Sequence, residues 1–375
     1  MSFDLLSVGK YGAGSDSYSA DNATKFNSYA QITSIAENQI VISTTNYLEG
    51  NYQKFTSDNE IMIHVSAIKS GTDTTYLGNY LVATITEVTE DSTNHTKTLT
   101  LNKDPRDLLA SNQLTFYHVQ AITIPSFSTL SPDESDIIQP NAFDASKFCG
   151  GILAFKVAGD FKMNGAKFKL SDCGIPVTSK SIRPTLTQEQ SGTGLQDINL
   201  WAGFENGVTR DRLLLNSGDG VAFIIAKNIT GDENSRIGNS DSYGVQYCRG
   251  ASDSVGGKPS NTTNIGGSTI LIAGDSFSNF TPKIISKYRA ANSTAGQGLA
   301  RCYIALKDTT LRIDEGLYSF DVVNDSNRVV NSLNIRNFGS GSLGDVSNST
   351  AQMNNYAKIT AISSRSEEHT SELQS

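Results

Sequence analysis

Cysteine is scarce in this chain, and no two cysteines lie at the short spacing of a metal or redox motif. The four cysteines, at positions 149, 173, 248 and 302, form no C-x-x-C pair, so the zinc and thiol-redox signatures are absent. Their low density also argues against the disulfide framework of small secreted domains. Cys149 and Cys173 flank apolar segments, and we expect both to be buried as small hydrophobic side chains.

An excess of positive charge and long apolar runs are also missing. The chain has 30 Lys and Arg against 38 Asp and Glu, a formal net charge of −8. A nucleic-acid or anionic-membrane surface needs a basic patch, so neither partner is expected. No apolar run approaches the roughly 20 residues of a membrane-spanning helix, so no membrane span is expected.

The two ends of the chain carry separate signals. Residues 365–375 match the translation of a common sequencing adapter, and we treat them as an artefact outside the fold. Without that segment 29 basic and 35 acidic residues remain, a net charge of −6. Residues 1–10 have neither a basic region nor an apolar core, so we expect no secretory signal.

The motifs of common enzymes are absent as well. The patterns H-E-x-x-H, G-x-S-x-G and G-x-x-x-x-G-K-[ST] do not occur, which leaves metalloprotease, nucleophilic-triad and phosphate-cradling chemistry without support. His64 and His118 lie in strand-like runs and are interpreted as half-buried or surface strand residues, and the third histidine is His95. We assign no catalytic residue, no metal ligand and no cofactor.

Paired carboxylates are the remaining enzymatic chemistry, because glycosidases place two Asp or Glu side chains on either side of the scissile bond. The candidates are Asp219, Asp232, Glu233, Asp314 and Glu315. Asp314 and Glu315 are adjacent and would point to opposite faces of a strand. Asp219 lies between two glycines, where an aspartate favours a turn.

Ser, Thr, Asn, Gly and β-branched residues are abundant, and helix-period apolar patterns are scarce. This composition predicts an all-β protein. Its organising stretch is the glycine turn and apolar run Gly150–Val157, which is echoed at Gly218–Ala226 and Gly266–Ala273. A short apolar run bounded by turn signals is typical of a strand buried on both faces. Three such strands far apart in the sequence favour stacked parallel rungs.

The first part of the chain is expected to form a small antiparallel β barrel or sandwich module over residues 26–124, after an extended lead-in segment over residues 1–25. Its strands are expected at Gln31–Ile35, Gln39–Ser43, Glu60–Val65, Leu81–Val88 and Lys97–Leu101. A turn at Glu37 and Asn38 would connect the first two of these strands, and the last two would form a hairpin.

Residues 125–149 contain Pro125, Pro132 and Pro140 and are expected to form a linker. Residues 150–330 are expected to form an irregular parallel β-helix-like domain. Its inserted loops, 177–212 and 231–262, would project from one face, as loops of solenoids do.

The N-terminal sequence recurs near the other end of the chain. Residues 338–362 align without gaps to residues 11–35, with nine identities over the 25 positions. The identical residues of the first copy are Gly12, Gly14, Ser15, Asn27, Tyr29, Ala30, Ile32, Thr33 and Ile35. We therefore expect residues 331–364 to begin a second, truncated copy of the N-terminal module in a modular array.

The chain resembles a group of mostly uncharacterised, Gly-rich β proteins of tailed phages, prophages and bacterial surfaces. The resemblance covers roughly residues 26–275 and rests on the segments Glu60–His64, His118–Pro125 and Gly150–Gly159, with the two later glycine echoes. It implies a fold and a location, but it carries no catalytic residues. This chain has fewer glycine repeats than typical members.

Aromatic residues on the inserted loops are the candidates for ligand binding. Trp201, Phe204, Tyr243 and Tyr247 would offer apolar ring faces and polar edges to a sugar. The alternative is that Trp201 packs in a core cap. The loop Gly231–Asp241 carries several hard oxygen donors, which calcium prefers, but EF-hand spacing is absent, and a solvated loop is the plainer interpretation.

These features favour a non-enzymatic structural or attachment protein of a phage virion, such as a tail fibre, whose partners are other virion proteins and a host-surface glycan. A virion protein leaves its host by lysis and needs no signal peptide. One alternative is a glycan-degrading, tailspike-like depolymerase; another is a bacterial surface adhesin, located at the cell surface or outside the cell. A homotrimer would suit a fibrous appendage, although the sequence has no coiled-coil pattern.

Overall fold

The computed structural model describes residues 11–20, 25–71, 76–170, 172–176, 213, 215, 220–232 and 234–238, and the later strands β13 to β19 as backbone. In this part of the chain nearly all regular structure is β, with two short 3₁₀ turns, η1 (Pro105–Asp107) and η2 (Ser111–Thr115). No helix among these residues is long and apolar enough to cross a membrane.

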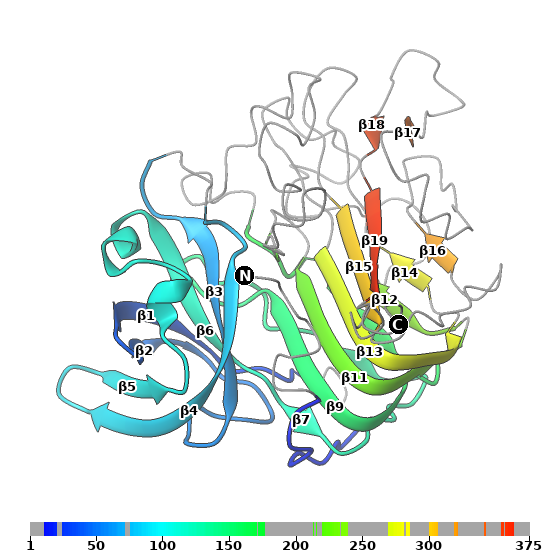
Figure 1. The fold of residues 1–375 in the computed structure, drawn as a ribbon, viewed down its shortest axis with the longest axis horizontal. Helices are drawn as coiled ribbons and strands as arrows, with labels where there is room; N and C mark the ends of the chain where they lie inside the picture. The colour runs from blue at the N-terminus through cyan, green and yellow to red at the C-terminus, as the bar shows by residue number, and fades with distance from the viewer. Residues whose placement is uncertain are drawn as a thin grey trace, which may run out of the picture.

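The first module is a closed antiparallel barrel with the strand order β1-β2-β5-β4-β3-β6 (Figure 1). Its strands are β1 (Tyr29–Ala36), β2 (Gln39–Leu48), β3 (Glu60–Ile68), β4 (Tyr80–Asp91), β5 (Thr96–Leu101) and β6 (Tyr117–Thr123). The pairing of β1 with β6 closes the sheet on itself, which removes the exposed strand edges of an open sheet.

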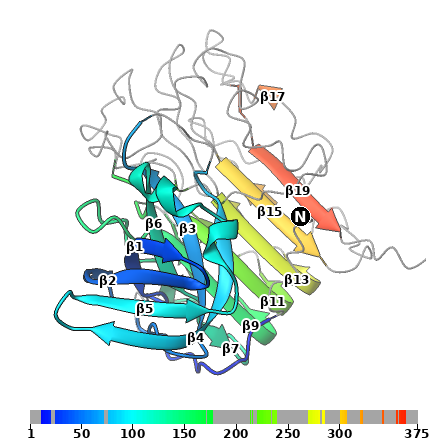
Figure 2. The same cartoon turned by 60° about the vertical axis from the view of Figure 1, so that its left-hand side comes forward.

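Apart from the antiparallel pair β17 and β18, the other described strands form two parallel sheets, one with the order β19-β15-β13-β11-β9-β7 and one with the order β16-β14-β12-β10-β8. The first sheet contains β7 (Ser126–Phe127), β9 (Ile152–Lys162), β11 (Val221–Gly231), β13 (Thr269–Phe280), β15 (Ala300–Leu306) and β19 (Ala357–Ser363). The second contains β8 (Ile137–Ile138), β10 (Lys167–Lys169), β12 (Arg236–Gly238), β14 (Lys283–Ile285) and β16 (Ser319–Asp321). Figure 2 shows the strands of the first sheet side by side, with the barrel next to β9 and β11.

The three glycine echoes of the sequence become neighbouring strands in register. Ile152 of β9 pairs with Val221 of β11, which pairs with Thr269 of β13. The first of these strands begins at Gly150 and Gly151, which have φ values of 113° and 83°. The apolar runs of the three echoes lie side by side in the parallel ladder.

Strands β9 and β11 are buried on both faces, as the unbroken apolar runs predicted. Leu153, Phe155 and Val157 of β9 belong to a core that also contains Phe168 of β10 and Ile237 of β12, so this core lies between the two parallel sheets. The alternate residues Ile152 and Ala154 of β9, with Val221, Phe223 and Ile225 of β11, belong instead to the core of the barrel. A strand covered on both sides has no polar face.

All five strands expected in the first module are present, each longer than expected, and β6 is a sixth. Glu37 and Asn38 form the predicted turn between β1 and β2, with Asn38 at a φ of 51°. The predicted hairpin is β4 and β5, and Asn164 and Gly165 form the turn between β9 and β10. Residues 125–149, expected as a linker, contain β7 and β8, which pair in parallel with β9 and β10.

The segment that repeats the N-terminal sequence is described only as backbone strands. Gly341–Ser342 (β17) pairs antiparallel with Asn354–Asn355 (β18). β19, which aligns with residues 30–36 of β1, pairs in parallel with β15, whereas β1 pairs antiparallel with β2 and β6.

The prediction of buried cysteines is confirmed for Cys149 and Cys173, which are free thiols inside the fold. Burial, with the nearby Asp144 carboxylate as a smaller cause, raises the pKa of the Cys149 thiol to about 12. The thiolate is the reactive form, so iodoacetamide at pH 8 is expected to leave Cys149 unmodified in the native protein and to alkylate it fully in 6 M guanidinium. Peptide mass spectrometry measures both. Rapid native alkylation of Cys149 would contradict this placement.

Candidate functional site

The candidate residues for sugar binding, Trp201, Phe204, Tyr243 and Tyr247, lie outside the described residues. The same holds for four of the five carboxylate candidates, Asp219, Glu233, Asp314 and Glu315. Asp232 is described, and its Oδ1 accepts hydrogen bonds from the backbone N–H groups of Asn234 and Ser235, each at 2.9 Å. This carboxylate shapes the turn before β12.

Polar chemistry within the described residues gathers where the barrel meets the parallel strands. There, side chains on the outer face of β3 and β6 reach the backbone that leads into β9 and β11. No group of three or more His, Cys, Asp and Glu side chains that could hold a metal occurs in the described part of the chain.

His64 and Gln120 form the centre of this junction. His64 Nε2 lies 2.6 Å from the carbonyl oxygen of Leu213, and Nδ1 lies 2.8 Å from Ser66 Oγ. A carbonyl only accepts, so Nε2 carries the proton and Nδ1 accepts from Ser66. Gln120 Nε2 donates to Ser66 Oγ at 2.7 Å and to the Gly150 carbonyl at 3.1 Å, and Gln120 Oε1 accepts from Gly150 N–H at 2.7 Å.

This network corrects the sequence-based interpretation of the two strand histidines. His64 is 0% exposed and His118 is 6% exposed, so neither is a half-buried or surface residue. Burial lowers the pKa of each to about 4, with the Lys69 charge as a second cause for His118. Both side chains are therefore neutral near pH 7.

Asn27 and Tyr29 attach the start of the barrel to the backbone of β9. Asn27 Nδ2 donates to the carbonyl oxygens of Thr123 at 2.7 Å and Ala154 at 2.5 Å, and its Oδ1 accepts from Ala154 N–H at 3.1 Å. Tyr29 Oη donates to the Ile152 carbonyl at 2.6 Å. Both side chains are 0% exposed, so these bonds replace water at the junction.

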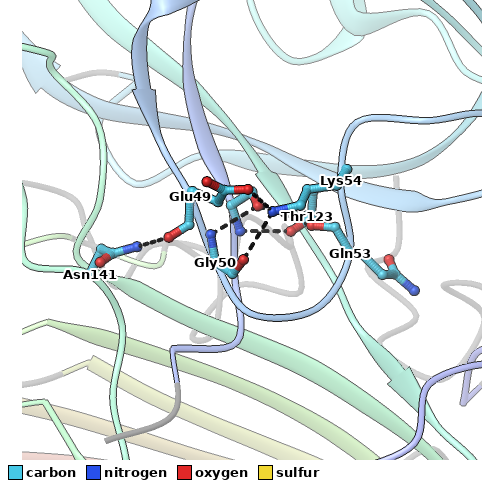
Figure 3. Close-up of polar contacts among 7 residues, drawn as sticks. Glu49, Gly50, Gln53, Lys54, Thr123 and Asn141 are labelled. Atoms are coloured by element: carbon cyan, nitrogen blue, oxygen red, sulfur yellow. Dashed lines mark hydrogen bonds and ion pairs between the residues drawn. The ribbon is translucent and has the colours of Figure 1, made fainter.

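Figure 3 shows a second set of polar contacts, in the loop between β2 and β3. Lys54 Nζ pairs with the Glu49 carboxylate and donates to the Gly50 carbonyl at 3.2 Å, while Asn141 Nδ2 donates to the Glu49 carbonyl at 2.9 Å (Figure 3). Ser28 Oγ accepts from Gly50 N–H at 3.1 Å and donates to the Gln53 carbonyl at 3.0 Å. The loop is thus held to Ser28, directly before β1, and to the segment before β9.

The lead-in segment covers the edge of the first parallel sheet. Asp16 N–H donates to the Ser126 carbonyl at 2.8 Å, and the Asp16 carboxylate accepts from Ser126 N–H at 2.7 Å. A Cβ on Gly12 would lie 2.1 Å from Ser126 Oγ, and one on Gly14 would lie 3.0 Å from Ser128 Cα. Only residues without a side chain fit this close to β7.

The residues identical in both copies of the repeat include those that make these contacts. Gly12, Gly14 and Ser15 lie against residues 126–128, and Asn27 and Tyr29 bond to β9. Asp16, Tyr18 and Phe26, which contact Ser126, Asp136 and Phe155, are replaced in the second copy by Leu343, Asp345 and Met353. The repeat thus preserves some of the docking residues and changes others.

Lys156 and Glu60 form a buried ion pair at the same junction. Lys156 Nζ lies 2.7 Å from Glu60 Oε1, and the two side chains are 0% and 17% exposed. Burial lowers the pKa of Lys156, and the Glu60 carboxylate opposes this shift. The sequence signal for this site was a single lysine inside the apolar run Gly150–Val157, which our sequence analysis did not single out.

Replacing Glu60 with glutamine is expected to lower the free energy of unfolding by about 3 kcal/mol, because it leaves the buried ammonium of Lys156 without its carboxylate. Urea denaturation measures the effect. The double variant Glu60→Leu with Lys156→Met is expected to regain most of the loss, since buried ion pairs are often replaced by apolar pairs at little cost. A Glu60→Gln variant as stable as the wild type would show that the pair contributes nothing.

Comparisons with known proteins identify no relative. No family model, no curated protein and no solved structure matches this chain.

Proposed function

We propose that this chain is a non-enzymatic structural and attachment protein of a phage virion, a tail fibre or similar appendage that holds a host-surface carbohydrate. In this proposal the two parallel sheets form a β-helix-like domain, each rung giving one strand to each sheet, and the barrel is a module docked on its first rungs. Its partners are other virion proteins and a host glycan.

The observation that carries the structural part is the recurrence of the docking residues. Residues 339–362 retain the glycines, the asparagine and the tyrosine with which the first module binds β7 and β9. The asparagine and tyrosine bond to backbone atoms of β9, so a second module could dock on any parallel strand with a similar backbone course. A repeated joint of this kind suits an elongated array.

The location in a virion is supported by the resemblance of roughly residues 26–275 to phage and prophage β proteins. The genomic sequence on both sides of the gene tests it. Tail, baseplate or lysis genes beside it support the virion, whereas a signal sequence upstream or a cell-wall anchor downstream would identify a bacterial surface adhesin.

One assay on purified protein distinguishes an attachment protein from a depolymerase. Labelled chain is incubated with a panel of bacterial surface polysaccharides, and bound protein and newly formed reducing ends are measured over a day. We expect retention on at least one glycan with no reducing ends above the buffer control. Continuous release of reducing ends would contradict the proposal and favour a glycan hydrolase with two carboxylates.

A further inference from the structure

A hollow with a mixed polar and apolar lining lies on the barrel where the strands β1 and β6 separate. Their ladder ends at the pair Gln31–Gln120, and η2 fills the space beyond it, anchored by Ser111 Oγ, which donates to the Ile35 carbonyl at 2.7 Å. The hollow has a volume of about 360 Å³ and is lined by Gln31, Ile32, Thr33, Lys69, Leu114, Thr115, Tyr117 and His118. This volume lies within the range of small-molecule sites.

The rim of the hollow is held in place by backbone contacts. Lys69 N–H donates to the Phe116 carbonyl at 2.7 Å, and Ser70 Oγ donates to the Thr115 carbonyl at 2.9 Å. The segment after β3 and the segment after η2 are therefore tied together. A site with a fixed rim loses little conformational freedom when it binds a ligand.

The lining has one charged group that the protein does not use in an ion pair. His118 offers no such group, because its ring is fixed by stacking on Phe148 with centroids 3.7 Å apart and planes at 6°, and its Nδ1 is buried out of reach of a ligand. Among the described residues, Lys69 takes part in none of the ion pairs.

The chemistry of the lining selects a charged and hydroxylated ligand. Lys69 is the only residue of the lining with a formal charge near pH 7, and it favours a carboxylate. Thr33, Thr115 and Gln31 offer hydroxyl and amide groups to a polyol, with Gln31 fixed by Asn46 Nδ2, which donates to its Oε1 at 2.5 Å. Ile32 and Leu114 add apolar surface for the C–H groups of a sugar ring.

We propose that this hollow binds the hexuronic acid residue of an acidic glycan, with Lys69 pairing with the carboxylate and Thr33 and Thr115 binding its hydroxyl groups. The inference rests on the proposed attachment role and gives it a substrate class. It places the contact on residues of the barrel rather than on the sequence-predicted Trp201 and Tyr243.

The test uses the full chain labelled with ¹⁵N and titrated with sodium glucuronate, with glucose as the matched neutral sugar. We expect saturable shifts of the Thr33, Lys69 and Thr115 amide signals with a Kd on the order of 1 mM, and binding of glucose at least about 10-fold weaker, since a charged hydrogen bond contributes about 1.5–3 kcal/mol. Equal binding of the two sugars, or no saturable shift of these signals, would overturn the proposal.

Two variants distinguish this site from a general effect of charge. Lys69→Met is expected to weaken glucuronate binding at least about 10-fold, whereas Lys97→Met, which removes an exposed lysine paired with Glu90 elsewhere on the barrel, is expected to leave it unchanged. If the chain binds acidic polysaccharide but Lys69→Met binds it equally well, the hollow is not the site, and the attachment role stands. If no glycan is retained while glucuronate still binds, the attachment role fails and the hollow remains a site.

Discussion

Replacing Gly150 with alanine is expected to lower the free energy of unfolding by about 4 kcal/mol, from backbone strain, overpacking and lost hydrogen bonds together. Gly150 has a φ of 113°, a conformation that alanine rarely adopts. The added Cβ would lie 2.5 Å from the Ala142 carbonyl oxygen and 3.0 Å from Phe143 Cα. Both are backbone atoms, so no side chain can rotate to make room.

The position of Gly150 at the junction increases the effect. Its N–H and carbonyl bond to the amide of Gln120 at 2.7 and 3.1 Å, and any shift that relieves the clash stretches these buried bonds. Because Gln120 also bonds Ser66, which bonds His64, the contact between barrel and sheet would weaken with it.

Gly71 provides the matched control for this prediction. Its φ is 82°, but a Cβ there would meet no atom within 4 Å, so Gly71→Ala tests strain without overpacking and is expected to cost about 1 kcal/mol. Chemical denaturation of the two variants measures the difference. Equal losses of unfolding free energy in the two variants would mean that contact of the added Cβ with the Ala142 backbone does not destabilise the protein.

Acidification from pH 7 to pH 4 is expected to destabilise the protein through His64 and His118. The pKa of each is lowered from 6.5 to about 4 in the folded protein, so the unfolded chain binds more protons within this window, and stability falls as pH falls. The loss is about 3 kcal/mol for each histidine once the pH is below about 4. Above pH 6.5 the two histidines do not make the free energy of unfolding depend on pH.

Other side chains with shifted pKa values do not produce the same dependence of stability on pH. The carboxylates whose hydrogen bonds lower their pKa values lose their contribution mainly below pH 4.5; they are Glu49, Asp91, Asp104 and Asp144. Asp16, whose pKa is raised by burial, binds its proton earlier in the folded state and acts in the opposite direction. The window between pH 6.5 and 4 therefore reports mainly on the two buried histidines.

Urea denaturation at a series of pH values measures this effect. The variants His64→Gln and His118→Gln are each expected to reduce the change of unfolding free energy between pH 6.5 and 4. This holds whether the substitution raises or lowers stability at pH 7. His95→Gln, at an exposed turn of the barrel, is the control and is expected to leave the dependence unchanged. An unaltered slope in both buried variants would show that the histidines do not titrate with folding.

Much of the fold could be predicted from local pattern. The turn at Glu37 and Asn38, the hairpin of β4 and β5, and the burial of β9 and β11 on both faces all follow from the order of apolar and turn residues. The short strands β7 and β8 were not predicted. At two residues each they are too short for any periodicity, and their pairing with β9 and β10 defines them.

The polar junction was not predictable, because each of its members looks unremarkable in its own segment. Asn27, His64 and Gln120 are single polar residues on strand-like runs. Their hydrogen-bond partners are distant in the sequence. Asn27 bonds to Ala154, 127 positions away, and His64 to Leu213, 149 positions away. Gln120 bonds to Gly150, 30 positions away. The repeat indicated that Asn27 and Tyr29 were retained, but only the folded chain gives the reason.

By itself, the sequence determined the all-β class, the strands at the three glycine echoes and the recurrence of the N-terminal segment, because turn residues and apolar runs act over a few neighbouring positions. Tertiary structure alone decided that the outer face of β9 and β11 is covered by a closed barrel, and that Lys156 meets Glu60 there. Apolar burial is not directional, so an apolar strand face requires a cover without specifying which segment supplies it.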